Sequence, residues 1–335
     1  MWDTPPKMRV CPTPMRPTSA VSEVVVGHFG KNHRIFAPAM KKQSNIAIGM
    51  AAGIAAGVSY GMNPLFAKPL LADGVSIPTM LFFRYAISVV IMAVWMKLKG
   101  ETFRVKANEF RLLVVLGLLF SLSSLFLFES YRFIPSGLAT TLVYLYPIFV
   151  ALIMVVLKSY PTWQTWIAIA VTFVGVILLS LPSGKLSLHA GGMILAALSA
   201  LSYAFYLVIV NRSTRISHIS NHTLTFYALA VGTVLFLCYQ YTSHVPFMNG
   251  VSTWKSALNL TGLAIFPTMI SLLTLAIATR HIGPTRTAIL GVFEPITAIL
   301  IGTLLFLEPI TPRMVIGITL CLAAVLFMSI HRPAK

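Results

Sequence analysis

A carboxylate lies in the middle of a long apolar stretch, at Glu294, directly before Pro295. An acid at that depth in hydrocarbon is costly, and such residues usually face a bundle interior or a water-filled cavity. Glu294 could carry a proton or bind the ammonium group of a ligand. The alternative is a neutral Glu294 that hydrogen-bonds backbone groups freed by the proline ring.

A second charge, Arg84, occurs in the apolar sequence FFRYA. Its guanidinium could bind the carboxylate of a ligand, pair with Glu294 or Glu129, or extend to the membrane surface. Glu129 and Arg132 lie three residues apart near the end of an apolar stretch, so we expect a surface ion pair between them.

Hydroxyl, phenol and amide groups recur at helical spacing in four other apolar stretches. A single Ser or Thr in a helix usually bonds its own backbone, but similar residues in several stretches favour one cavity lined by hydroxyls and tyrosines. The candidates are Ser59, Tyr60 and Asn63; Thr140 and Tyr144; Ser202, Tyr203 and Tyr206; and Ser271 and Thr274.

Ten apolar segments must position these residues. Of the 335 residues, 57% are hydrophobic and 10% are charged, which excludes a soluble globular enzyme, a disordered protein and a fibrous one. Stretches of about 20 residues are long enough to span a bilayer. The predicted spans are 45–66, 77–96, 110–131, 136–157, 162–181, 190–210, 221–241, 256–279, 284–306 and 311–330. We therefore expect an all-α polytopic membrane protein.

The positions of the basic residues explain a formal net charge of +17, which in a soluble protein would suggest nucleic acid. With the N-terminus inside, nineteen Lys and Arg residues lie on the inner side and five on the outer side. This bias predicts cytoplasmic N- and C-termini in a bacterial-type inner membrane and no nucleic-acid partner. Residues 1–44 are predicted to be a disordered basic cytoplasmic tail, and a mis-assigned start, with Met40 as the first residue, is the alternative.

Self-comparison indicates an internal duplication. Gly49, Gly53, Gly57 and Gly61 recur 143 positions later as Gly192, Ala196, Ala200 and Ala204, and the fourth and ninth spans align with an offset of 148. Small residues at this spacing let helices pack closely. The halves 45–181 and 190–330 hold five spans each, so the second must enter the membrane with inverted topology. Such repeats supply two near-equivalent states for alternating access; a duplication without transport is the alternative.

The order of several short motifs resembles that of the EamA family in the drug/metabolite transporter superfamily. These motifs are LVYLYPIFVALI, LGVFEPITAILIGTLLFLEP and a basic loop after the second span, and the resemblance covers about 45–330. It implies a ten-helix exporter or exchanger of small metabolites such as amino acids. Glu308 matches the family's glutamate after the ninth span, where an interface or cap role is expected.

The sequence thus predicts a secondary transporter, not an enzyme, that exports amino acids or similar small metabolites, with Glu294 as the coupling residue. The alternatives are a nucleotide-sugar or phosphometabolite exchanger, and a membrane-embedded lipid or glycolipid enzyme or translocase subunit. No Walker motif and no metal-ligand spacing is recognisable, so we expect no cofactor, metal or catalytic residue. The expected partners are the lipid bilayer, a small-molecule substrate, protons and, through the glycine faces, a second copy of the chain.

Overall fold

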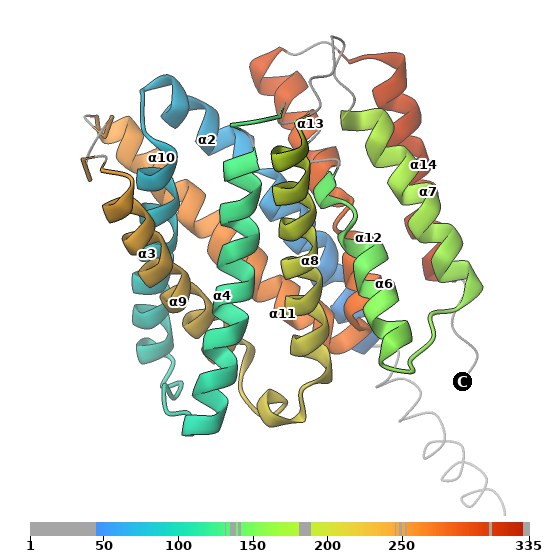
Figure 1. The fold of residues 1–335 in the computed structure, drawn as a ribbon, viewed down its shortest axis with the longest axis horizontal. Helices are drawn as coiled ribbons and strands as arrows, with labels where there is room; N and C mark the ends of the chain where they lie inside the picture. The colour runs from blue at the N-terminus through green and yellow to red at the C-terminus, as the bar shows by residue number, and fades with distance from the viewer. Residues whose placement is uncertain are drawn as a thin grey trace, which may run out of the picture. The chain divides into compact units, whose positions relative to one another are not determined.

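The computed structural model describes residues 45–130, 132–134, 139, 142–180, 189–244, 246–247, 250–251, 253–307 and 310–330. Within these ranges every regular element is helical (Figure 1). The predicted tail 1–44, Thr140 and Glu308 lie outside the described residues.

Ten apolar helical segments account for the ten predicted spans. Seven are long and apolar enough to cross a membrane, namely Asn45–Ala72, Ile77–Leu98, Ala107–Ser130, Ala190–Arg212, Asn221–Thr242, Trp254–Ile282 and Pro284–Phe306. Three shorter apolar helices, Tyr146–Val156, Trp163–Leu178 and Pro312–Phe327, occupy the remaining positions. The chain is therefore an all-α integral membrane protein, as the hydrophobic pattern predicts.

Six spans are single helices, and four are interrupted within the described residues. The single helices are α3 (Ile77–Leu98), α4 (Ala107–Ser130), α7 (Trp163–Ser180), α8 (Ala190–Arg212), α9 (Asn221–Thr242) and α14 (Pro312–Ile330). A turn at Met62 interrupts the first span, and a turn at Tyr144 and Leu145 precedes α6 (Tyr146–Val156) in the fourth. The first span ends in α2 (Asn63–Ala72), and a short 3₁₀ helix, η1 (Thr214–Ile216), follows α8. The eighth span consists of α10 (Trp254–Ala264), the π-helix η2 (Ile265–Ile270) and α11 (Ser271–Ile282), and the ninth of α12 (Pro284–Leu290) and α13 (Phe293–Phe306).

The helix contacts of the first half are repeated by the equivalent helices of the second half. The fifth and tenth spans, α7 and α14, lie side by side, and the second span, α3, packs against the seventh, α9 (Figure 1). The sixth span, α8, packs against α4 and α6 of the first half. The first span correspondingly contacts α10 and α13 of the second half through α2. Equivalent spans therefore have equivalent neighbours.

The stripe of small residues makes the close contacts that its spacing predicts. A Cβ atom built on Gly57 would lie 2.8 Å from Cβ of Phe293, and one on Gly49 would lie 2.8 Å from Cβ of His281. In the sixth span, Ala196, Ala200 and Ala204 are fully buried. The first span therefore packs on the end of the eighth span and on the ninth span with almost no side-chain layer between the backbones.

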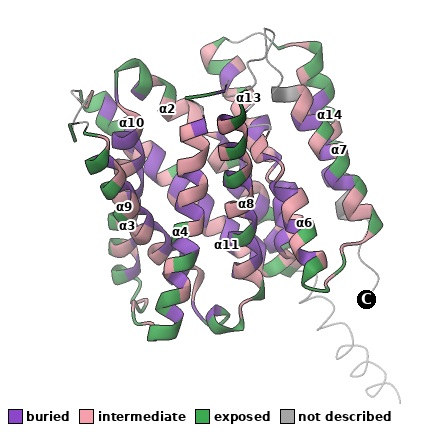
Figure 2. Cartoon of the chain, in the orientation of Figure 1, coloured by how far each residue is buried: buried purple, intermediate pink, exposed green. Residues whose placement is uncertain are grey.

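Burial differs between the inner and outer sides of the bundle. Buried residues gather where helices face one another, and exposed residues gather on outer faces and at helix ends (Figure 2). Large apolar side chains remain exposed on the outside, including Val90, Val156 and Leu304. Such a surface suits contact with lipid rather than water.

Candidate functional site

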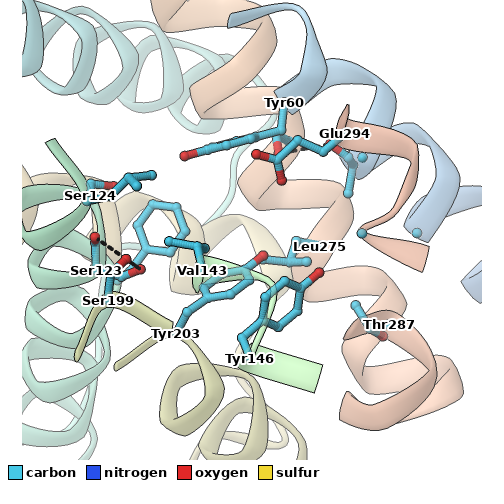
Figure 3. A pocket seen from close by; sticks show the side chains of 17 residues that line it. Tyr60, Ser123, Ser124, Val143, Tyr146, Ser199, Tyr203, Leu275, Thr287 and Glu294 are labelled. Carbon is cyan, nitrogen blue, oxygen red and sulfur yellow. Dashed lines mark hydrogen bonds between the residues drawn. The ribbon is translucent and has the colours of Figure 1, made fainter. Parts of the chain in front are cut away.

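A cavity lies among both halves of the helix bundle and encloses about 690 Å³ of empty space, including the part that opens to solvent. Its walls come from the first span and from α4, α6, α8, α11, α12 and α13, so segments far apart in sequence meet here (Figure 3). The lining residues are Gly53, Ala56, Gly57, Tyr60, Phe120, Ser123, Ser124, Leu127, Val143, Tyr146, Ser199, Tyr203, Ser271, Leu275, Thr287, Gly291 and Glu294.

Most of this lining consists of pairs related by the two sequence offsets. Ala56 and Ser199, like Tyr60 and Tyr203, are 143 positions apart, and four other pairs are 148 apart. Those four are Ser123 and Ser271, Leu127 and Leu275, Val143 and Gly291, and Tyr146 and Glu294. The cavity is thus built from the same positions in each half, and the one acid in its described lining replaces a tyrosine.

Two of these pairs make matching contacts across the halves. The Ser199 hydroxyl donates to the backbone oxygen of Ser123 at 2.7 Å, and the Ser271 hydroxyl donates to that of Ala56 at 3.1 Å. The two serine hydroxyls of Ser123 and Ser199 also lie 3.2 Å apart (Figure 3). Each hydroxyl therefore ties a helix of one half to a helix of the other.

Aromatic rings form one wall of the cavity. The rings of Tyr146 and Tyr203 meet edge to face with centroids 4.9 Å apart. Phe120 lies beyond Tyr203 at 6.3 Å. The Tyr146 hydroxyl donates to the backbone oxygen of Ala288 at 2.8 Å, which fixes the ring against α12. The wall therefore presents ring faces and edges in fixed orientations.

Glu294 lies in the first turn of α13, and its carboxylate points into the space bordered by Tyr60, Tyr146 and Tyr203 (Figure 3). The Glu294 side chain is half-buried, and its exposed part faces the cavity. The Tyr144 hydroxyl lies within hydrogen-bonding reach of it and donates to the backbone oxygen of Gly291 at 3.2 Å.

Arg84 is buried behind the cavity wall, with 2% of its surface exposed, and is not among the lining residues. Its Nε donates to the hydroxyl of Thr268 in η2 at 2.8 Å. Its guanidinium carbon lies 5.9 Å from the ring centre of Tyr60 and 5.8 Å from that of Tyr85. Arg84 also interacts electrostatically with Glu294. It therefore places a positive charge next to the carboxylate without entering the cavity.

The remaining predicted residues divide between the cavity and the packed helices. Tyr60, Tyr203, Ser271 and Glu294 line the cavity, whereas Ser59, Asn63, Tyr144, Ser202, Tyr206 and Thr274 do not.

The side chains away from the cavity mostly bond nearby backbone. The Asn63 amide donates to the Tyr60 oxygen at 3.0 Å, and the Thr274 hydroxyl donates to the Ile270 oxygen one turn back. Tyr206 is fully buried, and its hydroxyl has no partner among the described residues. The predicted surface pair is confirmed, with 3.3 Å between Arg132 and Glu129.

Two lining residues that sequence reasoning missed could have been found from the repeat. The offset of 148 applied backward from Glu294 gives Tyr146, and the offset of 143 applied to Ala56 gives Ser199. Among the described residues, no three His, Cys, Asp or Glu side chains come together as a metal site would require.

Comparison with known proteins supports a transporter. A model of the EamA-like transporter family matches residues 47–181 and again residues 190–330. An uncharacterized transporter of Archaeoglobus fulgidus is 28% identical over 190 residues, which are 57% of this chain and 66% of that protein. A second from the same organism is 27% identical over 249 residues, covering 72% and 84% of the two chains.

Two further similarities agree with these. An uncharacterized transporter of Synechocystis is 28% identical over 214 residues, covering 61% of this chain and 62% of that one. The chain thus spans about two thirds or less of the length of two of the three relatives. A solved crystal structure shares the fold, with a TM-score of 0.71 and 17% sequence identity. The match covers 84% of this chain and 96% of the chain in that structure.

Proposed function

Because the chain belongs to the EamA-like transporter family, we propose that it is a secondary transporter that exports amino acids or similar small metabolites by alternating access. The observation that carries this proposal is the cavity lined by equivalent positions of both halves. If the halves exchange conformations, the same cavity opens first to one side of the membrane and then to the other. We place this exchange in a bacterial-type inner membrane, with both termini in the cytoplasm.

The chemistry of the lining supports a substrate that carries an ammonium group. Glu294 supplies a negative charge, and the rings of Tyr60, Tyr146 and Tyr203 surround the space in front of it. Aromatic faces and a carboxylate attract an organic cation more strongly where water is excluded. The described lining contains no Lys, Arg or His, so it offers no charged partner for a phosphate. This favours substrates with an ammonium group, such as amino acids, over nucleotide sugars or phosphometabolites, whose charge is negative.

Glu294 is also our candidate for coupling transport to protons. A carboxylate in a cavity shielded from water is more stable when a proton or an ammonium group neutralises it. Arg84 lies behind Tyr60, close enough to interact with Glu294. Its positive charge lowers the cost of the charged carboxylate while neither a proton nor an ammonium group is bound. The glycine face of the first span, which suggested a homodimer, is covered by α11, α12 and α13 of the same chain, so a dimer would have to use another surface.

The test is transport by the purified full chain in proteoliposomes. Uptake is measured across a panel of amino acids, simple amines and sugar phosphates, with and without a pH gradient. We expect amino acids to be transported and Glu294→Gln to abolish the response to the gradient. Glu129→Gln is the matched control, because it removes an acid that pairs with Arg132 outside the cavity. Unchanged gradient-driven flux in Glu294→Gln would refute the coupling role, and flux of sugar phosphates alone would refute the substrate class.

A further inference from the structure

A second pocket lies at one end of the bundle, where α6 ends, α7 begins, α8 ends and α12 begins. We call it the arginine pocket, because Arg212 and Arg286 both line it. Uncharged polar side chains complete its lining, including those of Ser159, Thr162 and Gln164. It shares no lining residue with the cavity that contains Glu294.

The two arginines lack acceptors of the kind that Arg84, Arg132 and Arg280 have. Arg280 donates to the backbone oxygens of Ile219 and Ile216 at 2.6 and 2.9 Å. In the described part of the chain, by contrast, neither Arg212 nor Arg286 makes a hydrogen bond or ion pair, and no acidic side chain lines their pocket. Arg286 is half-buried, whereas Arg212 is exposed. A guanidinium has five N–H donors, and leaving them unsatisfied in a partly buried site is costly.

Aromatic and apolar side chains at the rim indicate how deep the pocket lies in a membrane. Tyr160, which lines the pocket, is 73% exposed, and Trp163 next to it is 64% exposed. Tyrosine and tryptophan in such positions are typical of the headgroup level of a bilayer. Val156 and Leu157 are also exposed just before this loop, and Lys158 adds a third positive charge beside the pocket. The surroundings thus combine exposed apolar side chains with three positive charges, of which Arg286 is half-buried.

We propose that the arginine pocket binds the phosphate group of an anionic phospholipid. Guanidinium groups bind phosphate oxygens in a two-pronged manner that a lysine does not reproduce. Basic pockets between membrane helices at the cytoplasmic surface are suited to lipid headgroups. A lipid, rather than a soluble phosphate, also covers the exposed apolar side chains at the rim with its acyl chains. This inference stands independently of the substrate of the central cavity.

The experiment measures lipid retention by the purified full chain in native mass spectrometry. Dioleoyl phosphatidylglycerol is titrated against dioleoyl phosphatidylcholine, first for the unchanged protein and then for Arg212→Ala/Arg286→Ala. Because hydrogen bonds from a guanidinium to a phosphate are about twice as strong as those between neutral groups, we expect the loss of both pocket arginines to weaken phosphatidylglycerol binding about tenfold or more. Arg104→Ala/Arg111→Ala is the matched control, since it removes two exposed cations from the same end of the bundle. It is expected to stay within about twofold of the unchanged protein.

Two further measurements distinguish lipid binding from binding of a soluble phosphate, and loss of the pocket from misfolding of the variant. Glycerol 1-phosphate is added to the lipid-free protein, and the thermal stability of each variant is measured in detergent. Equal binding of glycerol phosphate and phosphatidylglycerol would overturn the lipid assignment. Equal loss of phosphatidylglycerol in the pocket and control variants would overturn the pocket itself. Recovery of binding in Arg212→Lys/Arg286→Lys to less than the unchanged level would support recognition by guanidinium geometry as well as charge.

Discussion

Replacing Gly291 with alanine tests how tightly the cavity wall is built. Gly291 lies between α12 and α13, and a Cβ atom there would overlap the Tyr146 hydroxyl. The ring carbon that carries this hydroxyl would lie 3.1 Å away, which is a tight contact. The hydroxyl would have to leave its 2.8 Å hydrogen bond to the Ala288 oxygen. The substitution therefore changes the orientation of a ring that faces Glu294.

The magnitude follows from three contributions. Forcing a methyl group into a filled site costs about 1–3 kcal/mol, and losing a hydrogen bond costs about 0.5–1.5 kcal/mol. Alanine returns at most about 1 kcal/mol through its better helix propensity. We therefore expect Gly291→Ala to lower the free energy of unfolding by about 0.5–3.5 kcal/mol. Tyr146→Phe alone should cost about 1 kcal/mol, because the Ala288 oxygen keeps its bond from the Gly291 N–H.

A double-mutant cycle in mixed detergent micelles separates this explanation from others. In Gly291→Ala/Tyr146→Phe, the oxygen that occupies the position of the new methyl group is gone. The double variant should therefore be more stable than the sum of the two single effects predicts, with a coupling energy of about 1–2 kcal/mol. Strict additivity of the two losses would refute the proposed overlap and the wall geometry derived from it.

Two further substitutions test neighbouring features. Gly57→Ala should lower the melting temperature in detergent, because its methyl group would meet Phe293 at 2.8 Å; Gly191→Ala should not, because its nearest neighbour is a movable side chain at 3.3 Å. An unaffected Gly57→Ala protein would contradict the close packing of the first and ninth spans. A cysteine at Tyr203, which lines the cavity, should react with small thiol reagents, whereas one at fully buried Tyr206 should react far more slowly. The label is quantified by mass spectrometry, and faster reaction at position 206 would move the cavity to the other side of α8.

The features that sequence predicts well here are those fixed by periodicity. Hydrophobic length determines the ten spans, and the spacing of four from Gly49 to Gly61 determines which face of the first span packs closely. The repeat offsets carry this further, because they relate residues such as Tyr60 and Tyr203 that meet around one cavity. These properties depend on local pattern and duplication alone.

Other features depend on small rotations that periodicity does not specify. Tyr203 and Tyr206 lie on nearly the same helix face, yet only Tyr203 lines the cavity. Arg84 could reach several partners by length, and its bond to Thr268 depends on the local π-helical turn that directs that hydroxyl toward it. Pro267 marks a disturbance in the sequence, but a proline alone does not say which way the next residue will point.

The π-helix η2 has a consequence for the balance between the two halves. The equivalent part of the first half, residues 117–122, is regular α-helix inside α4, whereas Ile265–Ile270 takes the wider turn. If the two halves were identical, the two mirror-related conformations would have the same free energy and would be equally populated. If the halves exchange conformations as proposed, this widened turn of one half, which holds Arg84 through Thr268, would give the two conformations different free energies and so a preferred resting orientation. In the proposed mechanism, the asymmetry between the two halves would thus set which side of the membrane the empty cavity faces for most of the time.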